Sequence, residues 1–368
     1  MRKGFIVTLF MALASLVALA LDGSVLVRRL HHSASLMPGD LSQFRSVAAF
    51  ARHAPDAAAI AAQGLLYPPP FLLLALPLTW LPPATAYLVW GLAGTAALAA
   101  ATRLVTKSYS ALALGLGSSA TLYCLCMGQT GEFVSALLLT ALSQAQTRPI
   151  VAGIAAGCVI IKPQFALLLP LCFLAQGNWR AIGAASLTLA ALCALPCLIF
   201  TPGIWQAYLT HNTNAAVSFI NEPWPQLYQY PGITMFLMLR SLGLALPQAY
   251  AGQAVSSLAS GFTCWWLWRR TSPIPAQSRI AATLCLAVLA TPYAYTYDLT
   301  ALGVALAAQA AASDWRKLLP LALFWAFTSL CVIFSVTLFL IGALVMAAIA
   351  ALALSPAPRG TGTSPSPT

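Results

Sequence analysis

The chain has 368 residues, of which 60% are hydrophobic and only 7% are charged, and its mean hydropathy is +0.83. A typical soluble domain has roughly 25% charged residues, so this composition excludes an ordinary soluble protein and predicts an all-α polytopic integral membrane protein. The net charge of +11 does not indicate nucleic acid binding, because no basic run is interleaved with aromatic residues. Basic residues that flank membrane helices account for the charge.

The N-terminal segment begins with Met1-Arg2-Lys3 and continues as an apolar run, a pattern shared by signal peptides and by first membrane helices. A cleaved signal is one alternative, with Ala18-Leu19-Ala20 as the cleavage site. Because the apolar character continues towards Val27, the pattern favours an uncleaved first helix over 5–27.

Further apolar segments follow along the chain and predict about twelve transmembrane helices. With the first helix, they cover residues 5–27, 84–102, 109–127, 131–147, 149–161, 164–177, 181–200, 249–268, 279–293, 297–313, 318–333 and 335–354. Two other apolar stretches, 66–82 and 232–246, contain Pro or Gly and are expected to be re-entrant or interfacial. Residues 42–62 are expected to form an amphipathic helix on the membrane surface.

The domain organisation expected from this pattern is simple. Residues 1–354 form one transmembrane domain, and residues 355–368, which are rich in Pro, Ser, Thr and Gly, form a disordered tail. The nine cysteines lie mostly in apolar segments and are expected to be small buried hydrophobes rather than metal ligands or disulfide partners. We predict no metal site and no cofactor.

The distribution of basic residues predicts the orientation. With the N-terminus in the cytoplasm, most of the 18 Lys and Arg residues fall on the cytoplasmic side, as the positive-inside rule requires. The same orientation gathers a second group of polar residues on the outer face, namely Asp40, Glu132, Lys162, His211, Arg240 and Asp298. One face that carries acids, bases and aromatic residues above an apolar body suits a lipid-linked substrate.

Asp40 is the candidate general base. It follows the first helix and begins the amphipathic segment, so its carboxylate is expected at the membrane surface, where it could deprotonate an acceptor hydroxyl. The alternative is that Asp40 is only a helix N-cap.

Lys162 and Arg240 are the candidate cations for a donor phosphate. Lys162 lies in the hairpin Lys162-Pro163-Gln164 on the outer face, where a lysine can hold an anionic phosphate as a point charge. The alternatives are an interfacial lysine that extends to the membrane surface and, for Arg240, an interfacial anchor.

The other candidate site residues are polar or aromatic residues of the outer loops that could bind substrate. They are Tyr67, Gln129, Glu132, Gln164, His211, Tyr293 and Asp298. Tyr67 begins Tyr67-Pro68-Pro69-Pro70-Phe71, whose three prolines fix the backbone, although a plain helix start explains that segment equally well.

Taken together, these motifs resemble glycosyltransferase family 87 over roughly residues 5–310. The resemblance is carried by Asp40, Tyr67-Pro68-Pro69-Pro70-Phe71, Gly128-Gln129, Ile161-Lys162-Pro163-Gln164 with Trp179-Arg180, Leu239-Arg240-Ser241-Leu242-Gly243, and the stretch from Pro292-Tyr293 to Tyr297-Asp298. Each motif is short, but their order and spacing together are specific.

The resemblance implies a GT-C-like fold and an inverting transfer of mannose or another hexose. The donor would be a polyprenyl-phosphate sugar and the acceptor a glycolipid or glycan, on the outer, periplasmic face of a bacterial inner membrane. The resemblance makes Asp40 the catalytic base, with Lys162 or Arg240 stabilising the leaving phosphate. The polar stretch His211-Asn212-Thr213-Asn214 departs from the apolar character expected before Arg240 and leaves the acceptor open.

Two rival functions remain at this point. A lipid-linked-sugar flippase or small-molecule transporter would be expected to show repeat symmetry and charges at the membrane midplane, whereas we find no repeat and the charges gather at one face. A non-catalytic scaffold would tolerate neutralisation of the outer-face charges.

Overall fold

The computed structural model describes residues 9–17, 19–20, 39–54, 56–63, 67–226 and 231–312, together with residues 6, 27 and 229. The predicted helices 318–333 and 335–354 and the tail 355–368 lie outside these residues, as does part of the predicted first helix. Within the described part the fold is all-helical, and a single bridge between Gly232 and Tyr295 is the one β-type pairing there.

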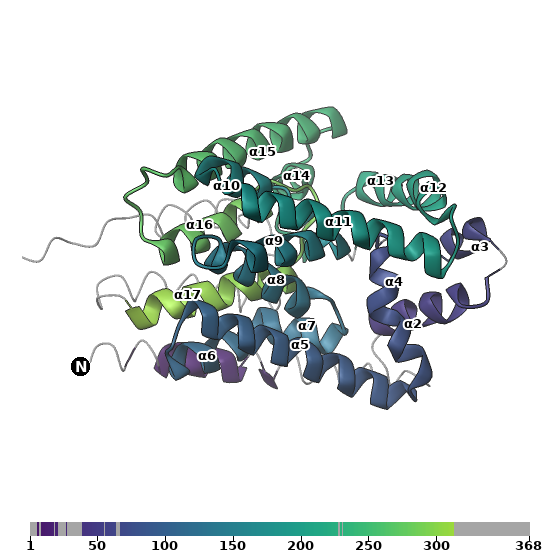
Figure 1. Cartoon of the computed structure of the whole chain (residues 1–368), viewed down its shortest axis with the longest axis horizontal. Coiled ribbons are helices and arrows are strands. Elements are labelled where there is room, and N and C mark those ends of the chain that lie inside the picture. The colour runs from purple at the N-terminus through teal and green to yellow at the C-terminus, as the bar shows by residue number, and fades with distance from the viewer. Residues whose placement is uncertain are drawn as a thin grey trace, which may run out of the picture.

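The helices of the described part follow the apolar segments closely (Figure 1). The α-helices are α2 (Gly39–Ala51), α3 (Ala57–Ala61), α4 (Pro70–Ala75), α5 (Pro83–Val105), α6 (Tyr109–Leu116), α7 (Ser119–Met127), α8 (Gly131–Gln144), α9 (Pro149–Cys158), α10 (Leu169–Gln176), α11 (Trp179–Ile199), α12 (Ile204–Ala207), α13 (Thr213–Asn221), α14 (Met235–Ser241), α15 (Leu246–Trp268), α16 (Ala276–Leu289) and α17 (Thr300–Ala312). The 3₁₀ helices are η1 (Leu76–Trp80), η2 (Val159–Ile161), η3 (Pro163–Phe165) and η6 (Thr296–Leu299), and a π-helix, η4, spans Tyr208–Asn212.

The all-α prediction is confirmed, but the count of about twelve membrane spans is not. By length and composition, α5 and α11 could each cross a membrane, and α6 with α7 form a third candidate that is bent by 45°. The apolar helices over 149–161, 163–176 and 276–289 are shorter. The first two are short because the chain leaves the α conformation around Lys162, where Pro163 disfavours an α-helical residue before it.

Small residues allow the long helices to pack closely. A Cβ atom at Gly153 of α9 would lie 2.3 Å from the carbonyl oxygen of Ala181, and one at Gly157 would lie 2.7 Å from Cβ of Thr188, both on α11. Glycines four residues apart bring two helix backbones together in this way in membrane proteins. This packing holds the backbones of α9 and α11 close together.

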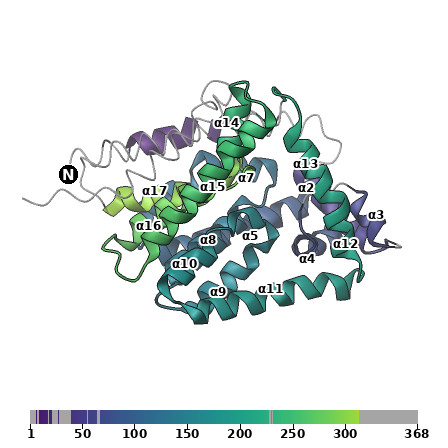
Figure 2. The same ribbon diagram turned by 90° about the horizontal axis from the view of Figure 1, so that it is seen from above.

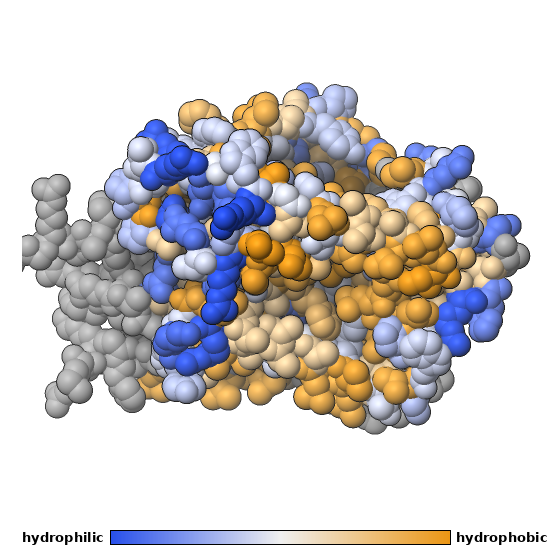
Figure 3. Space-filling model, viewed as in Figure 1, coloured by the Kyte–Doolittle hydropathy of each residue, from blue (hydrophilic) through white to orange (hydrophobic). Residues whose placement is uncertain are grey.

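The outer surface of the long helices is apolar. Figure 3 shows hydrophobic side chains spread over α5 and α11. Hydrophilic side chains gather towards the left and the right of the same view. Leu92 of α5 is 71% exposed, and Leu198 of α11 is 81% exposed. Phe262 of α15 is also largely exposed. Large exposed apolar side chains on several long helices fit contact with lipid.

The shorter helices cluster at one end of the molecule. Figures 1 and 2 both show α2, α3, α4, α12 and α13 together, away from α15, α16 and α17. Their own apolar core includes Leu41, Phe44 and Phe71. The C-terminal end of α7 contacts α2, and η2 contacts α4. The loops that follow α7 and η2 therefore lie beside this cluster of short helices.

Candidate active site

A cavity of about 600 Å³ lies between α2, the end of α7, the η2–η3 break and the loop before η6. This volume is within the range of roughly 300–1,000 Å³ typical of small-molecule sites. The cavity is lined by Asp40, Gln43, Phe44, Tyr67, Pro68, Tyr123, Met127, Gln129, Ile161, Lys162, Pro163, Gln164, Tyr208, Phe219, Pro231, Tyr293, Tyr295 and Tyr297. Its walls therefore combine one carboxylate, one ammonium group and many phenols.

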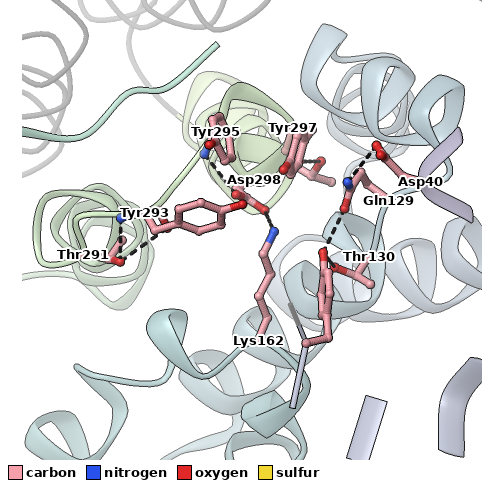
Figure 4. Close-up of polar contacts among 11 residues, drawn as sticks. Asp40, Gln129, Thr130, Lys162, Thr291, Tyr293, Tyr295, Tyr297 and Asp298 are labelled. Atoms are coloured by element: carbon pink, nitrogen blue, oxygen red, sulfur yellow. Dashed lines mark hydrogen bonds and ion pairs between the residues drawn. The ribbon is translucent and has the colours of Figure 1, made fainter. Parts of the chain in front are cut away.

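Asp40 reaches the cavity because α2 packs tightly against the end of α7. Gly128 ends α7 in the left-handed conformation, with φ of +64°, and a Cβ atom there would lie 2.7 Å from Cβ of Leu41. Glycine meets both requirements, since it adopts positive φ without strain and has no side chain to collide. The half-buried carboxylate of Asp40 then accepts a hydrogen bond from Nε2 of Gln129 at 3.0 Å (Figure 4).

Gln129 is held by both its backbone and its side chain. Its N–H donates to the carbonyl of Cys124 at 3.0 Å, and its own carbonyl accepts from the indole of Trp90 at 3.1 Å. Its side-chain oxygen accepts from the hydroxyl of Tyr67 at 2.9 Å. Tyr67 in turn packs its ring 4.4 Å from that of Phe71, and burial raises the pKa of its phenol well above the usual range.

Lys162 and Asp298 form a buried ion pair on another wall of the cavity (Figure 4). Each side chain is only 3% exposed. The ammonium nitrogen also lies 4.9 Å from the ring centre of Tyr297, within the range of cation–π attraction. Burial raises the pKa of the Asp298 carboxyl, while the Lys162 ammonium and the backbone N–H of Tyr295, at 3.1 Å, oppose the rise.

The loop that carries Asp298 is fixed by a second loop. The N–H of Thr296 donates to the carbonyl of Pro231 at 3.0 Å, and the N–H of Ile233 donates to the carbonyl of Ala294 at 3.1 Å. Tyr293, in the same loop, lines the cavity, and burial raises its pKa to about 12. The phenol is therefore neutral at physiological pH and can donate a hydrogen bond.

The structure brings together six of the predicted site residues. The cavity is lined by Asp40, Tyr67, Gln129, Lys162, Gln164 and Tyr293. Asp298 joins them through its ion pair with Lys162. His211 belongs to the π-helix η4, but its side chain lies outside the described part of the structure.

Glu132 and Arg240 do not line this cavity. Glu132 is 2% exposed and accepts a hydrogen bond from Thr95 at 2.9 Å, and its carboxylate packs against Gly94 of α5. Arg240 turns to its own helix end and donates to the carbonyl of Leu244 at 2.9 Å. Among the described cations, this geometry supports Lys162 and not Arg240 as the one facing the cavity.

Comparison with known protein families adds the deciding observation. The model of glycosyltransferase family 87 matches residues 65–292, more than half of the chain. The chain belongs to glycosyltransferase family 87. Comparisons with curated proteins and with solved structures gave no match. The family resemblance predicted from the motifs is confirmed, and it indicates a membrane glycosyltransferase.

The matched region of this family 87 protein covers most of the cavity but not all of it. Gln129 and Lys162 lie within the matched residues, and Tyr293 lies one position after their end. Asp40 and Asp298 lie outside them. The evidence for those two residues is therefore their geometry and not the family match.

Several aromatic residues of the family 87 cavity were not among the predicted site residues. Phe44 lies four positions after Asp40 on α2, so helical spacing from that residue could have indicated it. Tyr123 lies on α7 four positions before Met127, and neither was a predicted site residue. Tyr208 and Phe219 come from separate helices, and only the fold places them here. Within the described residues, no group of three or more His, Cys, Asp or Glu side chains could hold a metal ion.

Proposed function

We propose that this membrane glycosyltransferase transfers a hexose, such as mannose, from a polyprenyl-phosphate donor to a glycolipid or glycan acceptor, with Asp40 as the general base. The observation that carries the proposal is the pairing of a half-buried carboxylate, Asp40, with a buried ammonium group, Lys162, on two walls of one cavity. Sugar transfer from a lipid phosphate needs a base for the acceptor and a cation for the leaving group.

The reaction follows from these two groups. Asp40 takes the proton of the acceptor hydroxyl while the hydroxyl oxygen attacks the anomeric carbon of the sugar. The bond from that carbon to the phosphate oxygen breaks, its electron pair stays on the phosphate, and the anomeric configuration inverts. The ammonium of Lys162, held in place by Asp298, stabilises the developing negative charge on the polyprenyl phosphate.

The phenols of the cavity support binding of a neutral sugar. Tyr293, Tyr295 and Tyr297 line one wall and pack against each other, with ring centres 5.0 and 5.5 Å apart along the series. Tyrosine offers an apolar face together with a hydroxyl that forms hydrogen bonds. Such a wall suits a hexose, which also has apolar faces and hydroxyl groups, and Gln164 adds an amide.

An apolar groove supports a lipid-linked donor. A hollow of about 220 Å³ between α9, α10 and α11 is lined almost wholly by apolar residues, and Pro163 lies in both this groove and the cavity. An isoprenoid chain in the groove would bring its phosphate to Lys162, the residue before Pro163.

The helix connections support a site on the outer face. Arg148 precedes α9, Arg180 lies in the first turn of α11, and Arg269 follows α15, so these basic residues lie at the helix ends away from the cavity loops. By the positive-inside rule that end faces the cytoplasm. The proposal therefore places the cavity at the periplasmic side of a bacterial inner membrane.

The test is transfer of hexose from a polyprenyl-phosphate hexose in proteoliposomes. Removal of a general base typically costs roughly 100- to 10,000-fold, so we expect D40N to lose at least 100-fold in kcat. The matched control is D56N, because Asp56 caps α3 through Ala59 N–H, away from the cavity, and asparagine caps helices equally well. Full activity of D40N, or movement of a lipid-linked sugar across vesicles without a glycosyl product, would overturn the proposal.

A further inference from the structure

Both ends of the Gln129 side-chain amide are occupied by the protein. Nε2 donates to Oδ2 of Asp40 at 3.0 Å, and Oε1 accepts from the hydroxyl of Tyr67 at 2.9 Å. We infer that Gln129 and Tyr67 are positioning residues that orient the Asp40 carboxylate and keep it charged, and that they are not substrate-binding residues. The inference rests on the proposed role of Asp40 as the base.

The chain of hydrogen bonds has one favourable direction. An ionised carboxylate only accepts hydrogen bonds, so the amide must present its NH₂ group to Asp40 and its oxygen to Tyr67. The phenol of Tyr67 can donate to that oxygen because burial keeps the phenol protonated. If the amide turned over, its oxygen would face the carboxylate and its NH₂ group would face a donor. Tyr67 therefore fixes which end of Gln129 reaches Asp40.

Neither positioning residue is free to move to a substrate. The backbone of Gln129 is bonded on both sides, to Cys124 and Trp90, and the residue is only 7% exposed. The Tyr67 hydroxyl also lies 3.4 Å from Oγ1 of Thr130, and its ring contacts Phe44 and Phe71. To turn its side chain away from Asp40 and towards a substrate, Gln129 would have to break both of these hydrogen bonds in a buried setting.

The chemical consequence concerns the charge of Asp40. A neutral amide that donates to a carboxylate favours its ionised form, yet it adds no positive charge that would lower the basicity as strongly as an ion pair does. It also holds the plane of the carboxylate. Loss of the amide should therefore make Asp40 easier to protonate and less well aligned with the acceptor hydroxyl.

The experiment compares Q129M and Y67F with the wild-type protein in proteoliposomes that contain a polyprenyl-phosphate hexose. Methionine keeps the length of glutamine but removes both hydrogen bonds. We expect Q129M to lower kcat by about 10- to 100-fold, since small misplacements of a reacting group cost this much. We expect KM for donor and acceptor to stay within about twofold, and the acid limb of the kcat/KM profile to move to higher pH.

Y67F should shift the acid limb in the same direction by a smaller amount, and it carries the test if Q129M does not fold. The double variant should be no slower than Q129M alone, because the two residues act through one chain. The matched control is Y87F, which removes a phenol hydroxyl that donates to the carbonyl of Leu125 on α7 at 3.0 Å. Tyr87 does not line the cavity, so Y87F should leave kcat and the pH profile unchanged.

The outcomes separate this inference from the proposed function. If D40N abolishes transfer but Q129M and Y67F raise KM and leave the pH profile unchanged, the two residues bind substrate and this inference is wrong. If D40N keeps full activity, the proposed function itself fails.

Discussion

The two carboxylates at the cavity have opposite surroundings. Asp40 is half-buried and accepts a hydrogen bond from a neutral amide. Asp298 is 3% exposed and forms an ion pair with Lys162. Environment decides the role of a carboxylate, and here the Asp298 carboxylate is held by a cation whereas the Asp40 carboxylate is oriented by a neutral donor. The difference shows that Asp298 holds Lys162 in place, while Asp40 lies on the cavity wall, where the proposed acceptor hydroxyl would reach it.

Of the changes that follow from this difference, we expect substitution of Asp298 to have the largest effect on stability. In D298N the Lys162 ammonium is left buried without its counter-charge, and removal of one partner of a buried ion pair costs about 3–5 kcal/mol. We expect this loss in the free energy of unfolding, measured by thermal or denaturant unfolding in detergent. D40N should unfold like the wild-type protein.

The double variant K162M/D298L separates folding from function. Replacement of a buried ion pair by apolar residues is often neutral for stability, so we expect folding to recover. Transfer should not recover, because the cation for the leaving phosphate is gone. A stable K162M/D298L protein with wild-type transfer would show that Lys162 has no part in the reaction.

A smaller effect is expected at Gly128, which lets α2 bring Asp40 to Gln129. G128A would force an alanine into the left-handed region and place its Cβ 2.7 Å from that of Leu41. We expect a loss of about 1–2 kcal/mol in stability and a fall in kcat larger than any change in donor affinity. The control is G183A on α11, where a Cβ meets nothing within 4 Å and helix propensity predicts a gain of roughly 0.5–1 kcal/mol.

The smallest effect concerns Tyr293, on the Lys162 wall. Its pKa is raised from 10.0 to about 12 by burial, so the folded protein holds a proton that the unfolded chain releases. The stability from this group is complete below pH 10 and is lost as the pH rises towards 12. Y293F should therefore lessen the decline of stability over this window, measured by unfolding at several pH values.

Much of the helical pattern was predictable because long apolar runs determine it. The expected segments 84–102 and 181–200 correspond to α5 and α11, since each is apolar throughout and begins after a proline or an asparagine cap. The number of spans was not predictable in the same way. Apolar composition around Lys162 resembles a helix, but Pro163 breaks the chain into short helices there.

The sequence predicted which residues belong to the candidate site better than it predicted how they contact each other. Motif and topology placed Asp40, Gln129 and Lys162 on one face, and all three line the cavity. The ion pair joins residues 136 positions apart, so no local pattern could reveal it. Glu132 was grouped with the site because topology gives the face of the membrane, but it does not give the side of a helix that a residue occupies.

The central claim is that Asp40 serves the chemical step and that Lys162, held by Asp298, serves the donor phosphate. The most direct measurement is binding of a polyprenyl-phosphate hexose to purified D40N and K162M/D298L, alongside transfer by the same samples. We expect D40N to bind the donor within about twofold of the wild-type affinity without forming product, and K162M/D298L to lose donor binding. Loss of donor binding in D40N, or wild-type binding in K162M/D298L, would contradict it.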